Sequence, residues 1–258
     1  MKAIKVNLSK DIKSAELHIF ADLHIGDKFC DLESIKSRVE AVKANKNAYC
    51  ILNGDIINNA TKTSISDSYA EELSPMEQIE RFTEIFEPIK DRIIAITSGN
   101  HENRTYNKEG VDITYICAKQ LGLADRYSKT GAIIFLRVGQ GGAKTHNRPI
   151  NYMIYCTHGS GGGRKEGAKA IRLADMANII DADIYIHSHT HLPMIMKEAY
   201  YRTDAQNSSF RMVNKLFVNT SAMLKYGGYG EEKEFKPSSR DCPTIYLNGT
   251  KKEFRATL

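Results

Sequence analysis

The sequence has no CxxC motif, no pairing of cysteine with histidine, and no apolar run close to the roughly 20 residues that a membrane helix needs. Residues 1–7 lack the apolar stretch of a secretory signal. The five cysteines are an odd number, and Cys50, Cys117 and Cys156 lie within apolar segments. We therefore expect buried, reduced thiols in a cytoplasmic protein that does not contact a membrane.

The chain also has little excess of one charge. Its formal net charge is +5, with 26% charged and 41% hydrophobic residues, as is typical of a soluble globular domain. This charge is compatible with a phosphate-bearing substrate, but it falls short of the clustered basic surface of a dedicated nucleic-acid-binding protein. Nucleic acid therefore stays open as a partner.

No internal repeat and no convincing linker divides the 258 residues. We expect a single domain over residues 1–258 that buries a sizeable core. Its variable C-terminal part, about residues 194–258, carries no motif that we can place. We expect this part to shape substrate choice, and the sequence leaves the oligomeric state open.

Short apolar runs alternate with amphipathic segments in the first hundred residues. Apolar runs at 16–20, 48–52 and 92–97 predict strands, and helical spacing of apolar residues predicts helices over 31–45 and 75–86. This alternation predicts right-handed crossovers and a parallel sheet.

The pattern changes after residue 110. Helices are predicted over 111–121 and 167–180, and strands over 132–138, 151–157 and 183–187, the first two as an antiparallel pair. Further β-like runs cover 194–201, 210–219, 244–247 and 252–256. The segment 226–240, rich in Gly, Lys and Glu, is expected to be a mobile loop.

Seven potential metal ligands follow these apolar runs directly. They are Asp22, His24, Asp55, Asn100, His158, His189 and His191. Because sites of open α/β sheets lie outside the carboxyl ends of the strands, we expect these side chains to converge. Asp22 and His24 are two residues apart, so at the end of an extended segment both can face one point.

The ligand set mixes imidazole, carboxylate and amide and contains no thiolate. It favours divalent Mn, Fe, Zn, Ni or Co over a structural cysteine zinc site. Seven ligands are too many for one ion with an open position. Two ions about 3.5–4 Å apart would use them all, and that spacing suits attack on phosphorus by a hydroxide held between the ions.

His101 follows the potential ligand Asn100 directly. It is therefore held near the metals without having to bind them. We predict that His101 is the catalytic residue that protonates the leaving oxygen or stabilises its charge.

Five sequence blocks resemble those of the calcineurin-like metallophosphoesterases in order and identity, over residues 20–191. They are Asp22-Leu23-His24, Gly54-Asp55, Gly99-Asn100-His101-Glu102, Thr157-His158-Gly159 and His189-Thr190-His191. The resemblance implies an α/β fold in which helices flank a two-sheet β-sandwich (α/β/β/α). It implies one metal ion on Asp22, His24, Asp55 and His191, and a second on Asp55, Asn100, His158 and His189. It also implies that His101 is catalytic, and manganese is the metal we expect first. One position departs from the family pattern, because Ser188 stands where glycine usually precedes the first histidine of the last block.

Several residues near these blocks allow two interpretations each. His187 shares the two-residue spacing of His189 and His191. It is either a third ligand or a structural histidine. The segment 159–165 is a flexible connection or a phosphate-binding loop with Arg164 and Lys165. Arg104 clamps a substrate phosphate or forms a surface salt bridge. Lys225, Tyr226 and Tyr229 lie in a loop that is disordered or stacks on a base.

The sequence thus predicts a two-metal-dependent phosphoesterase, with a phosphodiester slightly favoured as substrate. A DNA or RNA nuclease, a protein phosphatase and a small-molecule phosphomonoesterase are the alternatives within the family. A non-hydrolytic scaffold of the same fold is the alternative from another class. All seven ligands and His101 are present, which weighs against the scaffold.

Overall fold

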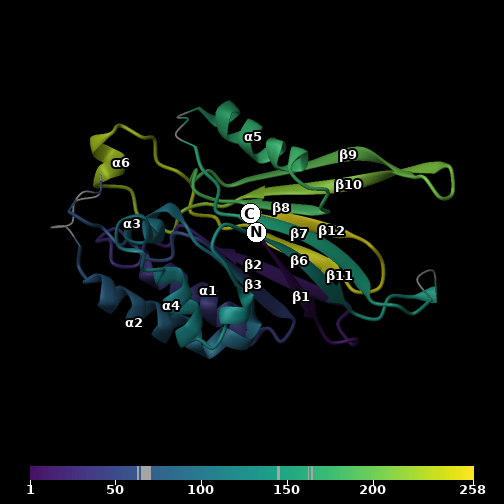
Figure 1. The fold of residues 1–258 in the computed structure, drawn as a ribbon, viewed down its shortest axis with the longest axis horizontal. Helices are drawn as coiled ribbons and strands as arrows, with labels where there is room; N and C mark the ends of the chain where they lie inside the picture. The colour runs from purple at the N-terminus through teal and green to yellow at the C-terminus, as the bar shows by residue number, and fades with distance from the viewer. Residues whose placement is uncertain (63, 65–70, 144–145, 162, 164) are drawn as a thin grey trace.

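The computed structural model describes residues 1–62, 64, 71–143, 146–161, 163 and 165–258, and it contains two sheets that face each other (Figure 1). The first sheet has the order β1 (Lys2–Asn7), β6 (Gly131–Val138), β7 (Ile150–Thr157), β8 (Ile184–His187), β10 (Ser209–Asn219), β9 (Met194–Asp204). The second sheet has the order β12 (Phe254–Thr257), β11 (Thr244–Asn248), β2 (Ser14–Phe20), β3 (Ala48–Asn53), β4 (Ile93–Thr97), β5 (Tyr127–Ser128).

Helices cover the outer face of each sheet. The second sheet is covered by α1 (Leu32–Ala44), α2 (Pro75–Phe86) and α4 (Ile113–Gln120), and the first by α5 (Glu166–Asp175). The α3 helix (Asn100–Glu109) directly follows the end of β4, and α6 (Tyr229–Glu232) is a single turn. Short 3₁₀ segments lie at Glu87–Arg92, Ala124–Arg126 and Met176–Asn178. In the described part of the chain, no helix has the length and apolar character that crossing a membrane requires.

The space between the two sheets is filled by aliphatic side chains from both. Ile19 and Ile51 of the second sheet are buried in the same cluster as Ile154, Ile186 and Val218 of the first. Alternate residues of the second sheet point the other way, toward the helices. The predicted α/β/β/α sandwich is confirmed.

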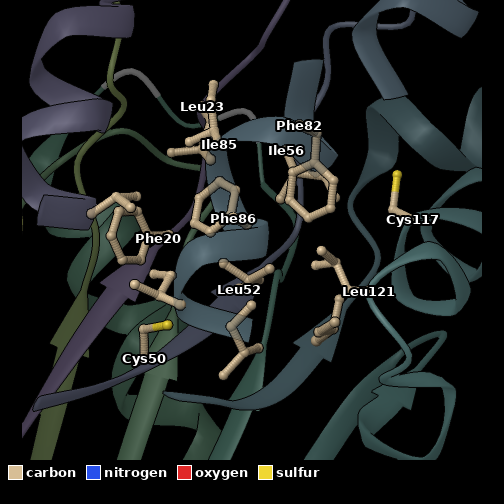
Figure 2. Packing of buried hydrophobic residues seen from close by; sticks show 14 of the residues in the cluster. Phe20, Leu23, Cys50, Leu52, Ile56, Phe82, Ile85, Phe86, Cys117 and Leu121 are labelled. Carbon is tan, nitrogen blue, oxygen red and sulfur yellow. The ribbon is translucent and has the colours of Figure 1, made fainter. Parts of the chain in front are cut away.

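The α2 helix shows how local sequence builds this packing. Ser74 accepts a hydrogen bond from the Glu77 backbone N–H, the Glu77 carboxylate accepts one from the Ser74 backbone, and Pro75 starts the helix. Its buried stripe includes Phe82 and Phe86, whose ring meets that of Phe20 edge-on at 5.2 Å (Figure 2). Such aromatic contacts fix α2 against the second sheet.

Strand direction determines where the candidate ligands meet. β2, β3 and β4 are parallel neighbours in the second sheet, and β7, β8 and β10 are parallel neighbours in the first. The predicted antiparallel pair, β6 and β7, is confirmed. The carboxyl ends of the parallel strands lie at one end of the sandwich, where the loops that follow them carry the potential ligands.

The structure differs most from the predicted elements at the following places. β1 was not predicted, because its six residues include two lysines and its partner β6 is distant in sequence. α3 was not predicted, because Glu102 is its single buried residue and an apolar stripe is missing. The helix predicted over 167–180 ends at Asp175, before a 3₁₀ turn. The segment 226–240 contains the short α6 within its loop.

Candidate metal centre

The seven predicted ligands converge at the carboxyl ends of the strands of both sheets. His158 Nε2 lies 3.2 Å from Asp55 Oδ2 and 3.9 Å from Asp22 Oδ1. Asp22 Oδ1 lies 3.2 Å from His191 Nε2 on its other side. The Asn100 side-chain oxygen is 3.2 Å from His158 Nε2, the ring of His189 is 5.3 Å from that of His158, and the ring of His24 is 5.5 Å from that of His191.

Backbone conformation aims these side chains at one another. Five of the seven have a left-handed backbone, with φ between 48° and 67°: Asp22, His24, Asp55, His189 and His191. They are half of the ten non-glycine residues with positive φ in the described ranges, and such residues cost about 1–3 kcal/mol each unless the surroundings enforce them. The extended segment predicted at Asp22 and His24 is therefore wrong. Two successive sharp turns, rather than an extended strand, direct both side chains to one side.

Glycine makes room for this convergence at one of the turns. Gly54, which precedes Asp55, has φ +81°, and a β-carbon there would lie 2.6 Å from Nδ1 of His158. The Asp22 N–H then donates to the Gly54 carbonyl at 3.1 Å. The loops after β2 and β3 therefore run side by side with the His158 ring against them.

Three overlapping groups of side chains are placed to hold metal ions. They are Asp22, His24 and His191; His24, Asp55 and His101; and Asp55, His158 and His189. Within each group the potential ligand atoms lie within 4.8 Å of one another. Asp55 belongs to two of these groups, so a carboxylate lies between the two ends of the cluster.

Buried atoms without partners indicate that this cluster is built to be completed by a cation. Among the described residues, neither ring nitrogen of His24 has a hydrogen-bond partner, although the side chain is buried. Asp22 Oδ1 is likewise buried and has no hydrogen-bond partner. A buried polar atom left unpaired is costly. Imidazole nitrogen and carboxylate oxygen are ligands of borderline divalent metals, so the residues present fit such ions.

The charges in the cluster are strongly coupled. Burial disfavours the charged form of His158, but the Asp55 and Asp22 carboxylates outweigh it and raise the pKa of His158 to about 10. Burial also opposes ionisation of Asp55, yet His158 and His101 hold the pKa of Asp55 well below its usual range. A proton on His158 therefore balances the buried carboxylates when no metal ion does so.

His101 is held in one tautomer by its two partners. Its Nδ1 lies 2.7 Å from the Asn58 carbonyl oxygen, so Nδ1 carries the proton. Nε2 lies 2.9 Å from the Arg104 guanidinium and must accept a hydrogen bond. Burial lowers the pKa of His101 to about 4, with Asp55 acting against this shift and Arg104 acting with it. The imidazole is therefore neutral near pH 7.

Residues 17–193 of the chain match the family model described as calcineurin-like phosphoesterase. The chain belongs to this family. The resemblance inferred from the five sequence blocks is thereby confirmed, and no curated protein matches the chain.

Several solved structures show a distant likeness to this chain. The first is an uncharacterized, predicted phosphoesterase from Streptococcus pneumoniae TIGR4, with 13% identity, a TM-score of 0.39, and coverage of 94% of this chain and 87% of that one. A metallophosphoesterase from Sphaerobacter thermophilus has 13% identity and a TM-score of 0.39, covering 93% and 89%. The Pseudomonas putida nuclease MPE has 10% identity and a TM-score of 0.37, covering 93% and 87%.

Glu102, named from the sequence only as part of a family block, organises the site. It is buried, and its carboxylate accepts backbone N–H groups of Gly99 (2.9 Å), Asp55 (3.1 Å), Ile56 (2.7 Å) and Ile57 (3.1 Å). It therefore ties the loop that carries Asp55 to the first turn of α3. Its position three residues after Gly99, with Gly110 ending the helix, is the capping pattern that predicts α3.

Ser188, the departure from the family pattern, has a defined place in this phosphoesterase. It is fully buried, and its hydroxyl accepts a 2.7 Å hydrogen bond from the Asn53 amide, which also donates to the Thr157 carbonyl. Ser188 is not among the residues with positive φ. The local backbone therefore does not require glycine.

His187 contacts a neighbouring strand rather than the cluster of potential metal ligands. Its Nδ1 lies 2.8 Å from the Asn219 side-chain oxygen, and Asn219 also donates to Thr190 Oγ1 at 2.8 Å. A β-carbon at Gly159 would lie 2.0 Å from the His187 ring. These contacts support a structural role, in which His187 and Asn219 hold the turn between His189 and His191.

The three predicted substrate-binding residues, Arg104, Arg164 and Lys165, lie in different surroundings or outside the described residues. Arg104 contacts His101 and the Asn58 carbonyl (3.3 Å) instead of a surface carboxylate. Lys165 is exposed just before α5, and Arg164 lies outside the described residues. A cation that the sequence did not suggest, Lys169 of α5, donates to the Thr190 carbonyl at 2.7 Å, between two predicted ligands.

The segment that follows β10 lies along the same region. In this segment the Met223 N–H donates to the Asp22 carbonyl at 3.0 Å, and the Lys225 N–H donates to the Phe29 carbonyl at 2.8 Å. Tyr226 is half exposed, and its hydroxyl donates to the Phe235 carbonyl. The C-terminal part of the chain therefore borders the candidate metal centre through its backbone.

Proposed function

We propose that this protein is a two-metal phosphoesterase whose centre is organised around Asp55. The observation that carries the proposal is the position of this carboxylate, 3.2 Å from His158 on one side and within the ligand group of His24 on the other. A carboxylate has two oxygens and can serve two cations. Divalent ions at such a pair of sites supply charge stabilisation and an activated water for displacement at phosphorus.

The ligand assignment is the one that the family resemblance implies, and the groups of potential ligands in the structure support it. We propose that Asp22, His24 and His191 hold one ion and that Asn100, His158 and His189 hold the other, with Asp55 shared. Each group contains a carboxylate or amide oxygen together with imidazole nitrogen, which suits manganese first and iron, zinc, nickel or cobalt next. We further propose that the protein acts in the cytoplasm.

His101 and Arg104 are proposed to act as a pair on the leaving group. In the contacts described, His101 has no proton to give from Nε2, because that atom accepts from Arg104. The arrangement therefore favours stabilisation of the leaving oxygen's charge, supplied by the guanidinium that His101 holds, over direct protonation by His101. Fixed charge aimed at developing charge is an effective form of catalysis.

The substrate class is proposed with less specific support. The net charge of +5 and the Lys169 ammonium beside His189 and His191 favour a phosphodiester, whose second substituent extends beyond the metals. Contacts of Met223 with Asp22 support a role of residues 194–258 in substrate choice. A nuclease is the second candidate, and its activity would fall steeply with salt because several phosphate contacts release counterions.

The test is a parallel assay of metal-stripped protein after addition of Mn²⁺. The substrates are bis-p-nitrophenyl phosphate, p-nitrophenyl phosphate and a labelled oligonucleotide, each with and without chelator. We expect Mn²⁺-dependent hydrolysis that is fastest on the diester and is greatly reduced in His101→Ala. Two bound metal ions with no hydrolysis of any substrate would contradict the enzymatic proposal and favour the scaffold.

A further inference from the structure

The β9 strand is a long edge strand whose outer side is open. It spans 11 residues at the end of the first sheet, and in the described part of the chain no strand pairs with its outer edge. It pairs with β10 residue for residue over its whole length, from Met194 opposite Asn219 to Asp204 opposite Ser209. Proteins usually protect such edges with short length, proline, a bulge or charged side chains, and of these devices β9 has only its charged residues.

The hairpin of β9 and β10 also carries an apolar face that the described residues of its own chain leave uncovered. At its base, Ile195, Leu216 and Val218 are part of the core between the sheets. Farther along the same face, Tyr201, Met212 and Phe210 are 73%, 64% and 70% exposed. In Figure 1 the hairpin extends past the strands of the second sheet, so these strands do not cover the side chains near its tip. We call these three residues the tip patch, and contiguous exposed apolar groups of this kind mark interaction sites.

The opposite face of the hairpin is anchored to the body of the protein. Tyr200 packs with Tyr185 and Phe217 beneath α5. Lys215 is buried, with its ammonium 2.7 Å from an Asp181 carboxylate oxygen and 2.9 Å from the Tyr185 hydroxyl. The hairpin is therefore held in an extended shape before any partner arrives, so pairing costs little ordering entropy.

We propose that the partner of this edge is a second copy of this chain, paired antiparallel through β9 of each copy about a twofold axis at Tyr200. Such an axis, perpendicular to the sheet, keeps the inner faces of both copies on one side. It sets Ala199 opposite Tyr201 of the second copy. It also sets Glu198 opposite Arg202 of the second copy, twice by symmetry, and opposite charges facing each other across strands are stabilising.

Neighbouring registers are less favourable. Centring the axis on Tyr201 sets Glu198 opposite Asp204 of the second copy, which places like charges together. Centring it on Ala199 gives no pair of opposite charges. Charge complementarity therefore selects the register at Tyr200.

The same register covers the tip patch. Antiparallel pairing lays the end of each hairpin beside the base of the other, where Lys197 lies 5.7 Å from the ring of Phe254 on β12. Tyr201 and Phe210 of one copy thus pack near the β12 edge of the other. Because both β9 edges are then paired with each other, the assembly closes as a dimer and does not grow further.

The test is a charge-exchange experiment read by sedimentation velocity at micromolar concentrations. Wild-type protein is expected at twice the 29.0 kDa mass of one chain. Glu198→Arg and Arg202→Glu each place like charges opposite in a homodimer and are expected to be monomers. An equimolar mixture of the two variants places opposite charges together again and is expected to restore the dimer. Glu80→Arg, the same change at an exposed position of α2, is the matched control and should remain dimeric.

Thermal melts by circular dichroism establish that each variant is folded. Tyr201→Asp is a second probe that leaves both charged residues in place, and it should also give a monomer. Wild-type protein that is monomeric throughout the concentration range would overturn the proposal. A dimer that survives Glu198→Arg and Tyr201→Asp would overturn it as well, because the contact would then lie elsewhere.

Discussion

The Arg104 guanidinium lies 2.9 Å from Nε2 of His101, one turn earlier on α3, so the single lone pair of that imidazole faces a permanent cation. The Asn58 carbonyl holds the other ring nitrogen at 2.7 Å. This arrangement fixes His101 as a neutral group and makes Arg104 the charge that it positions. The two residues therefore need separate tests.

His101→Gln is expected to lower turnover by roughly 10²–10³ while both metal ions stay bound, because the Arg104 guanidinium that stabilises the leaving oxygen loses the ring that positions it. Arg104→Gln is expected to lower kcat with little change in KM if the guanidinium stabilises the leaving oxygen. A rise in KM at constant kcat would instead show that Arg104 clamps substrate phosphate. Lys108→Gln, which removes an exposed charge from the same helix, is the control and should change neither constant.

The pH dependence of turnover offers an independent check on His101. Burial lowers its pKa to about 4, so the protonated form is absent above about pH 6. We therefore expect kcat to show no decline with rising pH around 6.5, where an ordinary histidine acid would lose its proton. A falling limb centred near pH 6.5 that disappears in His101→Gln would show that His101 is the general acid after all.

Metal binding is expected to release a proton from His158. Burial opposes its charge, but Asp55 and Asp22 raise its pKa to about 10, so the metal-free protein carries this proton at neutral pH. Because a metal ion needs the neutral imidazole, proton and metal compete, and apparent affinity should rise with pH between about 7 and 10. Calorimetric titration with Mn²⁺ in buffers of different ionisation enthalpy measures the proton count. Metal binding without proton release at pH 7.5 would contradict the proposed role of His158.

The candidate ligands were predictable because each follows an apolar run that ends as a strand. Their convergence follows from the parallel pairing of β2, β3 and β4, which alternation of strands and helices already predicts. The left-handed backbone of five of them was not predictable from the same signal. Asp22 and His24 adopt it because the paired loops after β2 and β3 enforce it, and hydrophobic periodicity carries no information on such turns.

Other parts of the site depend on contacts that have no local signal. Lys169 reaches the Thr190 carbonyl from a helix in an earlier part of the chain, and nothing near Lys169 in sequence indicates this. α3 lacks an apolar stripe, so only its capping residues mark it. The predicted roles of the seven ligands and of His101 remain predictions until metal and activity are measured.

Asp55→Asn is expected to remove both metal ions together. Asp55 is the carboxylate shared by two of the ligand groups, and an amide supplies neither its charge nor its second acceptor oxygen. Elemental analysis after dialysis against Mn²⁺ measures the stoichiometry. Asp125→Asn, at an exposed position, is the matched control and should keep both ions. Retention of one ion in Asp55→Asn would show that Asp55 serves a single site.

Ser188→Gly, which restores the usual family residue, is expected to destabilise this protein. The Ser188 hydroxyl accepts from the buried Asn53 amide at 2.7 Å, and its removal leaves one N–H of that amide unpaired. Glycine also has more freedom in the unfolded chain, and together these effects should cost about 1–3 kcal/mol. Urea unfolding of the metal-free protein measures the change. Ser188→Ala separates the causes, because it removes the hydroxyl without adding backbone freedom, and it should cost less than glycine. A Ser188→Gly variant as stable as wild type would mean that the hydrogen bond to Asn53 contributes nothing and that serine here is a neutral replacement.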